Sequence, residues 1–184
     1  MPLQNKVRLI GGAWRRRMIA FPAVEGLRPT ADRVRETLFN WLGQTLDGKN
    51  CLDLFAGSGA LGFEALSRGA ARVVMVERDR QALRALRENA EKLGAERLEL
   101  HDADALQFLS RESRRFDVVF LDPPFHKSVL PLLFPILENR LNPGGRVYAE
   151  SEQPLQPVEN WRIWREGRAG KVFYYVLMRE GDTP

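Results

Sequence analysis

Cysteine and histidine are scarce in this chain, and long apolar runs are missing. One cysteine, Cys51, and two histidines occur in 184 residues. An intrachain disulfide is therefore impossible, and no Cys/His cluster has the spacing of a zinc site. No apolar run approaches the roughly 18 residues that a membrane-spanning helix needs, and the first residues lack the apolar segment of a signal peptide. We therefore expect an intracellular protein in a reducing setting, with no metal and no membrane contact.

Positive charge is concentrated at one end of the chain. The formal net charge is +4. Residues 1–35 hold eight Lys and Arg against two acids, a net +6, so the other 149 residues together carry −2. A basic segment of this kind is expected of a contact with a polyanion such as nucleic acid. The alternative is a solvated basic arm that only aids solubility.

The basic segment has the pattern of a β-hairpin. Residues 6–10 alternate polar and apolar, Gly11 and Gly12 signal a turn, and residues 17–21 can pair back. One aromatic side chain beside three arginines at the tip suits phosphate contacts with some stacking, whereas a disordered tip is the alternative. We treat residues 1–26 as a basic N-terminal hairpin extension. The predicted RNA contacts are Lys6, Arg8, Trp14, Arg15, Arg16, Arg17 and Arg28.

Strands and helices alternate through the rest of the chain, which predicts one domain over residues 27–180. Thr30 is a good N-cap for a helix that runs to about residue 46. Continuous apolar runs indicate strands buried on both faces, and hence a mostly parallel sheet between helix layers. A terminal antiparallel pair suits one edge of that sheet. The seven predicted strands are 51–55, 72–76, 97–101, 116–121, 146–150, 162–165 and 172–178.

The first of these strands leads into a glycine-rich turn and the start of a helix. Gly57, Gly59 and Gly62 match the G-x-G-x-x-G spacing of nucleotide-binding turns. Glycine tolerates positive φ and lets backbone N–H groups approach a ligand. Alone, this spacing indicates an adenosine-type ligand and names no cofactor.

Acids at the ends of the following strands narrow the choice of cofactor. Glu77, 20 residues after Gly57, is placed to accept hydrogen bonds from ribose hydroxyls, or it is a charge at a helix start. Asp53 would repel the pyrophosphate of a dinucleotide but suits the sulfonium and ammonium groups of S-adenosylmethionine; a turn-capping Asp is the alternative. Asp104 and Ala105 can bind the adenine edge, or Asp104 caps the next helix.

The segment Asp122-Pro-Pro-Phe125 is the sharpest chemical signal. Two prolines after a central strand end it and fix a rigid extended loop. Asp122 and the exposed Pro123 carbonyl can accept both hydrogens of a planar amine, which localises the nitrogen lone pair for in-line attack on a sulfonium methyl. Phe125 can stack on the base. The predicted catalytic residues are Asp122, Pro123, Pro124 and Phe125.

Taken together, these motifs resemble those of class I S-adenosylmethionine-dependent amino-methyltransferases. Arg28-Pro-Thr30 and the segment 32–42 resemble, more narrowly, the bacterial RsmD-type enzymes, which methylate N2 of a guanine in 16S ribosomal RNA. The resemblance implies a Rossmann-like seven-stranded α/β sheet with a small hairpin extension, and it places Arg28, Pro29 and Thr30 near the methionine end of the cofactor. The predicted cofactor contacts are Asp53, Phe55, Ala56, Gly57, Ser58, Gly59, Glu77, Arg78, Asp104, Ala105 and Thr30.

The same resemblance implies a cytoplasmic enzyme that acts on 16S ribosomal RNA within the 30S subunit or an assembly intermediate, and we expect it to be a monomer. Three other functions stay open. A DNA or RNA adenine-N6 or cytosine-N4 methyltransferase usually carries a separate target-recognition region, for which little chain remains. An NAD-dependent oxidoreductase conflicts with Asp53 and with the Pro-Pro loop. A non-catalytic RNA-binding assembly factor would not need the acidic positions.

Overall fold

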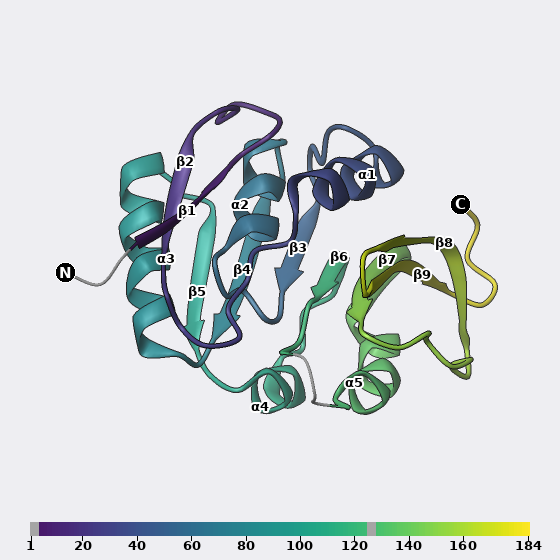
Figure 1. The fold of residues 1–184 in the computed structure, drawn as a ribbon. Helices are drawn as coiled ribbons and strands as arrows, with labels where there is room; N and C mark the ends of the chain where they lie inside the picture. The colour runs from purple at the N-terminus through teal and green to yellow at the C-terminus, as the bar shows by residue number, and fades with distance from the viewer. Residues whose placement is uncertain (1–3, 125–127) are drawn as a thin grey trace.

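A seven-stranded sheet between two helix layers forms the body of the protein (Figure 1). The computed structural model describes residues 4–124 and 128–184. The strand order is β5-β4-β3-β6-β7-β9-β8, with the first five strands parallel and β9 antiparallel to both of its neighbours. This order confirms the predicted α/β fold. The strands are β3 (Asn50–Asp53), β4 (Arg72–Glu77), β5 (Leu98–Asp102), β6 (Phe116–Leu121), β7 (Leu141–Ser151), β8 (Trp161–Ala169) and β9 (Val172–Arg179).

The central strands are apolar on both faces because helices cover both faces. Val73 and Met75 of β4 pack on one side, against a cluster that includes residues of α1, α2 and α3, whereas Val74 and Val76 pack on the other, with residues of α4 and α5. This double burial explains the continuous apolar runs in the sequence. The helices are α1 (Asp32–Leu42), α2 (Ala60–Ser67), α3 (Arg80–Leu93), α4 (Ala105–Arg111) and α5 (Leu130–Leu137), which continues into a 3-10 turn, η1 (Glu138–Arg140). No helix among the described residues is long and apolar enough to cross a membrane.

The first helix begins and ends differently from the sequence prediction. Its N-cap is Ala31, which makes no side-chain cap, so the predicted cap at Thr30 is wrong. The Thr30 hydroxyl instead faces two carboxyl groups of the sheet. The helix stops at Leu42, short of residue 46, because Gly43 has φ +93°, a conformation that ends helical geometry.

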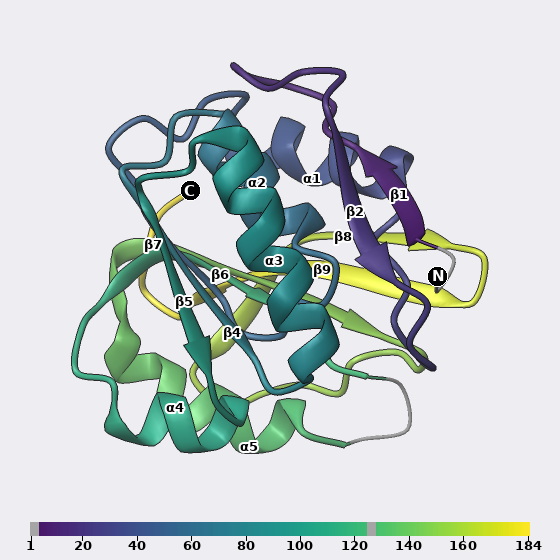
Figure 2. The same ribbon diagram turned by 90° about the vertical axis from the view of Figure 1, so that its left-hand side faces the viewer.

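The predicted hairpin is present as a separate two-stranded antiparallel sheet. Strands β1 (Gln4–Arg8) and β2 (Met18–Pro22) pair with each other and lie outside α3 (Figure 2). Asn89 of α3 accepts from the backbone N–H of Ala20 at 3.1 Å and donates to its carbonyl at 2.7 Å. The hairpin therefore forms an additional layer outside α3. The division of the chain at residue 26 stays a prediction.

The loop between β1 and β2, here called the tip loop (residues 9–17), is fixed to α2. The Glu64 carboxylate accepts from the N–H groups of Ile10 at 3.0 Å and Gly11 at 2.7 Å, and the Ser67 hydroxyl accepts from that of Trp14 at 2.9 Å. The fully buried Arg35 joins the same network. The backbone of the tip loop is thus bound, and the +6 of residues 1–35 is not all surface charge.

Candidate active site

The carboxyl ends of the parallel strands bring three predicted acids to one edge of the sheet, here called the carboxyl edge. Asp53 ends β3 and Glu77 ends β4, while Asp122 directly follows β6. In the sheet register, Asp53 pairs with Met75 of β4 and with Phe120 of β6. Parallel strands end at a common edge, which is where open α/β sheets bind ligands.

Asp53 is a buried acid with an unused oxygen. It is 1% exposed, and Oδ2 accepts from the Gly62 N–H at 3.0 Å. Its Oδ1 is buried and has no hydrogen-bond partner among the described residues. Burial raises the pKa of Asp53 to about 7, the nearby Glu77 adds to the rise, and the Gly62 N–H opposes it. An unsatisfied buried acceptor is costly, so this oxygen has the chemistry to receive a cationic donor from a ligand.

The three glycines of the turn have different tasks. A Cβ at Gly59 would lie 2.6 Å from Leu86, and one at Gly62 would lie 2.3 Å from Met75, so packing requires both glycines. At Gly57, whose φ is +53°, the nearest atom would be 3.8 Å away, on Leu27. Gly57 is therefore the member of the motif that leaves open space in front of the turn.

Glu77 holds the backbone around that space. Its Oε2 accepts from the Gly57 N–H at 2.8 Å, and its Oε1 accepts from the N–H groups of Arg78 at 2.9 Å and Asp79 at 2.8 Å. The side chain that caps α3 is Asp79, not Glu77. Each oxygen of Glu77 can accept further hydrogen bonds. The predicted contact between Glu77 and the ribose of a cofactor therefore stays a prediction.

Several of the other predicted cofactor residues already have local structural partners. Asp104 caps α4 by accepting from Leu106 and Gln107, as the alternative interpretation had it, and its Oδ2 lies 3.8 Å from Arg78. The Ser58 hydroxyl accepts from the Ala60 N–H at 3.2 Å at the start of α2. Of the remaining three, Ala56 packs into one core cluster, whereas Phe55 and Ala105 pack into the cluster on the opposite face of the sheet. Their contacts with a cofactor stay predictions.

Asp122 belongs to a cluster of acids. The sequence predicted Asp122 but not its neighbour Glu150. The Thr30 hydroxyl lies 3.3 Å from Asp122 Oδ2 and 3.1 Å from Glu150 Oε1, which also accepts from the Tyr148 hydroxyl at 2.6 Å. The strands β6 and β7 pair in parallel, with Leu121 opposite Ala149, so Asp122 and Glu150 are neighbours. Pro123 is buried and Pro124 is exposed.

Both carboxyl groups of this cluster are shifted toward the protonated form. Burial raises the pKa of Asp122 well above its usual range, and the negative charges of Glu150 and Asp53 add to the rise. Burial also raises the pKa of Glu150, against the hydrogen bonds from Tyr148 and Thr30. The predicted catalytic residue Phe125 lies outside the described residues. Glu150 could have been found from sequence, since it closes a predicted strand as Glu77 does.

The predicted RNA contacts divide into two groups. Arg28 is exposed in the connector between β2 and α1 (residues 23–31). Leu27 of this connector lies next to Gly57. Arg17 donates to the Lys92 carbonyl near the far end of α3, a helix of 14 residues and thus about 21 Å long. The tip loop therefore lies at the opposite end of the molecule from the carboxyl edge (Figures 1 and 2). Arg15 and Arg16 are exposed there, while Lys6 and Arg8 are exposed along β1.

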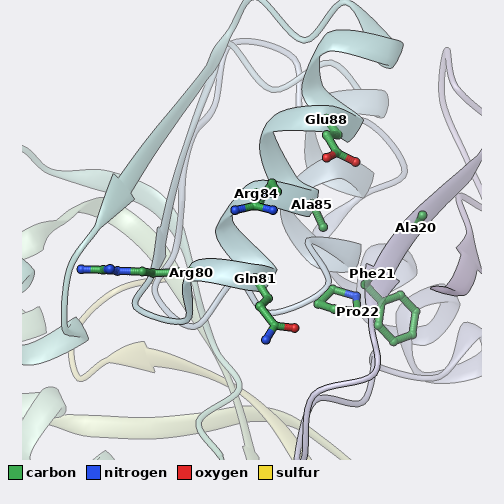
Figure 3. A pocket seen from close by; sticks show the side chains of 8 residues that line it. All are labelled: Ala20, Phe21, Pro22, Arg80, Gln81, Arg84, Ala85 and Glu88. Atoms are coloured by element: carbon green, nitrogen blue, oxygen red, sulfur yellow. The ribbon is translucent and has the colours of Figure 1, made fainter. Parts of the chain in front are cut away.

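A groove of about 540 Å³ lies between β2 and the first half of α3 (Figure 3). Arg80 and Arg84 extend from its α3 side, away from Phe21 and Pro22 of β2. The first turn of α3 follows directly on Glu77 and Asp79, so the groove opens beside the carboxyl edge. Arg80 and Arg84 are both exposed, and they lie closer to Glu77 than the tip loop does.

Comparison with known proteins assigns both the class and the family. A structure of the ribosomal protein L11 methylase of Lactobacillus delbrueckii shares the fold, with a TM-score of 0.64 over 84% of this chain and 82% of that one, at 20% identity. The fold is the one found in class I methyltransferases. A family model described as conserved hypothetical protein 95 matches residues 7–178. The chain belongs to this family, the RsmD-type methyltransferases.

Individual relatives agree over nearly the whole chain. Ribosomal RNA small subunit methyltransferase D of Escherichia coli is 43% identical, over 97% of this chain and 92% of its own length. The solved structure of YhhF from Escherichia coli has a TM-score of 0.85 at 43% identity, over 96% of this chain and 99% of that one. The 16S rRNA N2 methyltransferase RsmC of Thermus thermophilus, solved with AdoMet and guanosine, has a TM-score of 0.69 at 25% identity, over 95% of this chain and 49% of that one.

Proposed function

We propose that this protein transfers a methyl group from S-adenosylmethionine to the exocyclic N2 amine of a guanine in 16S ribosomal RNA. The observation that carries the proposal is the placement of Asp53 and Asp122 at the ends of adjacent parallel strands, β3 and β6. One acid has a free oxygen for a cationic cofactor, and the other follows the strand that leads into the Pro-Pro loop. The names of relatives that match nearly the whole chain support the RNA substrate.

The residues of the carboxyl edge fit this cofactor. Asp53 Oδ1 would receive the positive end of the molecule, Gly57 leaves room for it, and Glu77 would accept from its ribose hydroxyls. When bound, S-adenosylmethionine supplies a methyl group made electrophilic by the attached sulfonium. An NAD-type dinucleotide would instead bring a pyrophosphate close to Asp53, and the negative charge of the Asp53 carboxylate would repel that group.

Asp122 would act on the amine of the guanine. An oxygen of its carboxyl group and the Pro123 carbonyl would each accept one N–H, and Pro124 has no N–H to compete for that carbonyl. Two acceptors fix the amine and reduce delocalisation of its lone pair into the base. Positioning and electrostatics of this kind are large contributions to catalysis in water-excluded sites.

The spread of exposed arginines favours a large, folded substrate. Arg28 and the groove arginines lie beside the carboxyl edge, whereas Arg15 and Arg16 lie in the tip loop, near the far end of α3, a helix of 14 residues and thus about 21 Å long. A short single strand entering the site would not need contacts so far apart. We therefore favour the 30S subunit or an assembly intermediate as substrate, with the protein acting as a monomer in the cytoplasm.

Methyl transfer to defined RNA tests the proposal. Purified protein is incubated with radiolabelled S-adenosylmethionine and either 30S subunits or naked 16S RNA from a strain that lacks the gene, with Asp122→Asn protein as the inactive control. We expect label in N2-methylguanosine, identified by nucleoside mass spectrometry. Label in N6-methyladenosine or N4-methylcytidine would move the activity to another amine, and no label in either substrate would reject the proposal.

A further inference from the structure

The Thr30 hydroxyl bridges two acids from neighbouring strands. It lies 3.3 Å from Asp122 Oδ2 and 3.1 Å from Glu150 Oε1. A hydroxyl has one hydrogen, so it can donate to one of these oxygens and can only accept from the other. Two ionised carboxylates would leave one of the contacts without a hydrogen. A proton on one of the two acids would let the hydroxyl donate to one oxygen and accept from the other.

The hydrogen bonds identify which acid carries that proton. Glu150 Oε1 also accepts from the Tyr148 hydroxyl at 2.6 Å, so two donors converge on it and favour its ionised form. Burial raises the pKa of Asp122 well above its usual range, and the negative charge of Glu150 adds to the rise. Asp122 is thus the protonated member of the pair, and Glu150 the carboxylate.

Among the described residues, no positive side chain is paired with either acid. Within residues 4–124 and 128–184, no lysine or arginine forms an ion pair with Asp122 or Glu150. The titratable groups that act on them are Asp53 at the end of β3 and Tyr148 on β7. Like charges at such short range disfavour the doubly ionised state of a buried pair, so the pair favours holding one proton.

We propose that Thr30 and Glu150 form, with Asp122, a relay that removes the proton released from the amine during methyl transfer. This inference rests on the proposed function. The nitrogen lone pair forms the bond to the methyl carbon, and the carbon–sulfur bond breaks with its electron pair left on sulfur. One N–H bond then breaks, its electron pair stays on nitrogen, and its proton moves to an Asp122 oxygen. The proton that Asp122 already held passes to the Thr30 hydroxyl, whose own proton passes to Glu150.

In this relay Thr30 and Glu150 are positioning residues, because they act through Asp122. Glu150→Gln keeps the size of the side chain but cannot take a proton. We expect kcat to fall by about 100-fold, with the cofactor Kd within about threefold of wild type. Glu159→Gln makes the same change at an exposed loop position and serves as the matched control, with kcat unchanged.

The hydroxyl of Thr30 provides a second, independent variant pair. Thr30→Val removes the hydroxyl at constant shape, and we expect a loss of kcat similar to that of Glu150→Gln. Thr30→Ser keeps the hydroxyl and should restore most of the activity. Equal losses in the Val and Ser variants would mean that the methyl group and its packing matter, and would overturn the relay. A Glu150→Gln protein with kcat within about twofold of wild type would also overturn it.

Infrared spectroscopy of the free protein detects the shared proton without any reaction. In an Asp53→Asn background, which removes the third acid, the protonated-carboxyl C=O stretch should persist at neutral pH. Its titration midpoint should move to lower pH in Glu150→Gln, because Asp122 then loses its like-charged neighbour, and stay in place in Glu159→Gln. A band that does not move contradicts the relay. A wild-type protein that keeps the band but transfers no methyl would reject the proposed function instead.

Discussion

Arg35 and Glu64 form an ion pair at 3.2 Å with both side chains fully buried. The same guanidinium donates to the backbone carbonyls of Thr30 at 3.0 Å and Arg8 at 2.9 Å. The Glu64 carboxylate in turn accepts from the tip loop and from Arg68, at 2.9 Å. One pair of residues therefore joins the hairpin, the connector, α1 and α2.

Removing one partner of this pair should strongly destabilise the fold. We expect Arg35→Met to lower the free energy of unfolding by about 3–5 kcal/mol, because Glu64 loses one of its two cationic partners and the Thr30 and Arg8 carbonyls lose their donor. Arg8→Met is the control, since Arg8 meets Asp32 at 3.4 Å with both side chains half exposed, and such pairs contribute about 0–1 kcal/mol. Urea denaturation measures both. Equal effects of the two variants would contradict a structural role for the buried pair.

Asp122 is expected to serve the reaction and not the binding of the cofactor. Asp122→Ala should abolish methyl transfer, because the amine loses an acceptor and a route for its proton. The cofactor Kd, measured by calorimetry, should stay within about tenfold of wild type, which corresponds to about 1.4 kcal/mol. Loss of binding in place of activity would make Asp122 a cofactor residue.

Cofactor affinity should depend on pH through Asp53. The pKa of Asp53 is raised by burial to about 7, and only the ionised form attracts a cation. As pH falls below 7 the carboxylate becomes protonated, so the cofactor Kd should rise by up to about tenfold per pH unit. Above pH 7 the affinity should level off.

The matched variant for this titration is Asp53→Asn. It should bind the cofactor more weakly and lose the Asp53-linked pH dependence, because the neutral amide does not titrate. Calorimetry between pH 5 and 8 measures both proteins. A wild-type Kd that is flat across that range would show that Asp53 does not face the charged end of the cofactor.

The arginines of the tip loop are predicted to contact RNA phosphates. Replacing Arg15, Arg16 and Arg17 together with Gln should weaken RNA binding and lower the slope of log K against log salt by about 0.7–0.9 per lost contact. Arg80→Gln with Arg84→Gln tests the groove beside the carboxyl edge in the same assay. An unchanged slope in the tip variant would make that basic loop a solvated surface.

Sequence predicted those parts of the site that follow local rules. Acids that close apolar strands lead to Asp53, Glu77 and Asp122, because parallel strands share one edge. Thr30 was misread because a threonine before a helix usually caps it, whereas its partner Glu150 lies 120 residues away in the chain. Such a contact depends on the order of strands β6 and β7 in the sheet, which no local pattern contains.

The net charge of residues 1–35 counted Arg35 as part of a basic surface, and this was wrong for a related reason. Arginine is usually exposed, so its position in a basic segment indicates surface charge. Besides Asp32, three residues earlier, Arg35 pairs with Glu64, which lies in a helix whose residues are all buried, and no local pattern joins Arg35 to Glu64. Strand ends were also approximate: β8 extends over Trp161–Ala169, beyond the predicted 162–165, because its pairing with β9 continues to the turn.

The attachment of the tip loop to Glu64 affects how the protein folds. The amides of Ile10 and Gly11 are bonded to a side chain of the central core, so they can exchange with solvent only when that core opens. The hairpin and the sheet should consequently unfold in one cooperative transition. A chain cut before α1 would lose the Ile10 and Gly11 donors to Glu64 along with the hairpin, while Arg35 and Arg68 would remain as its partners.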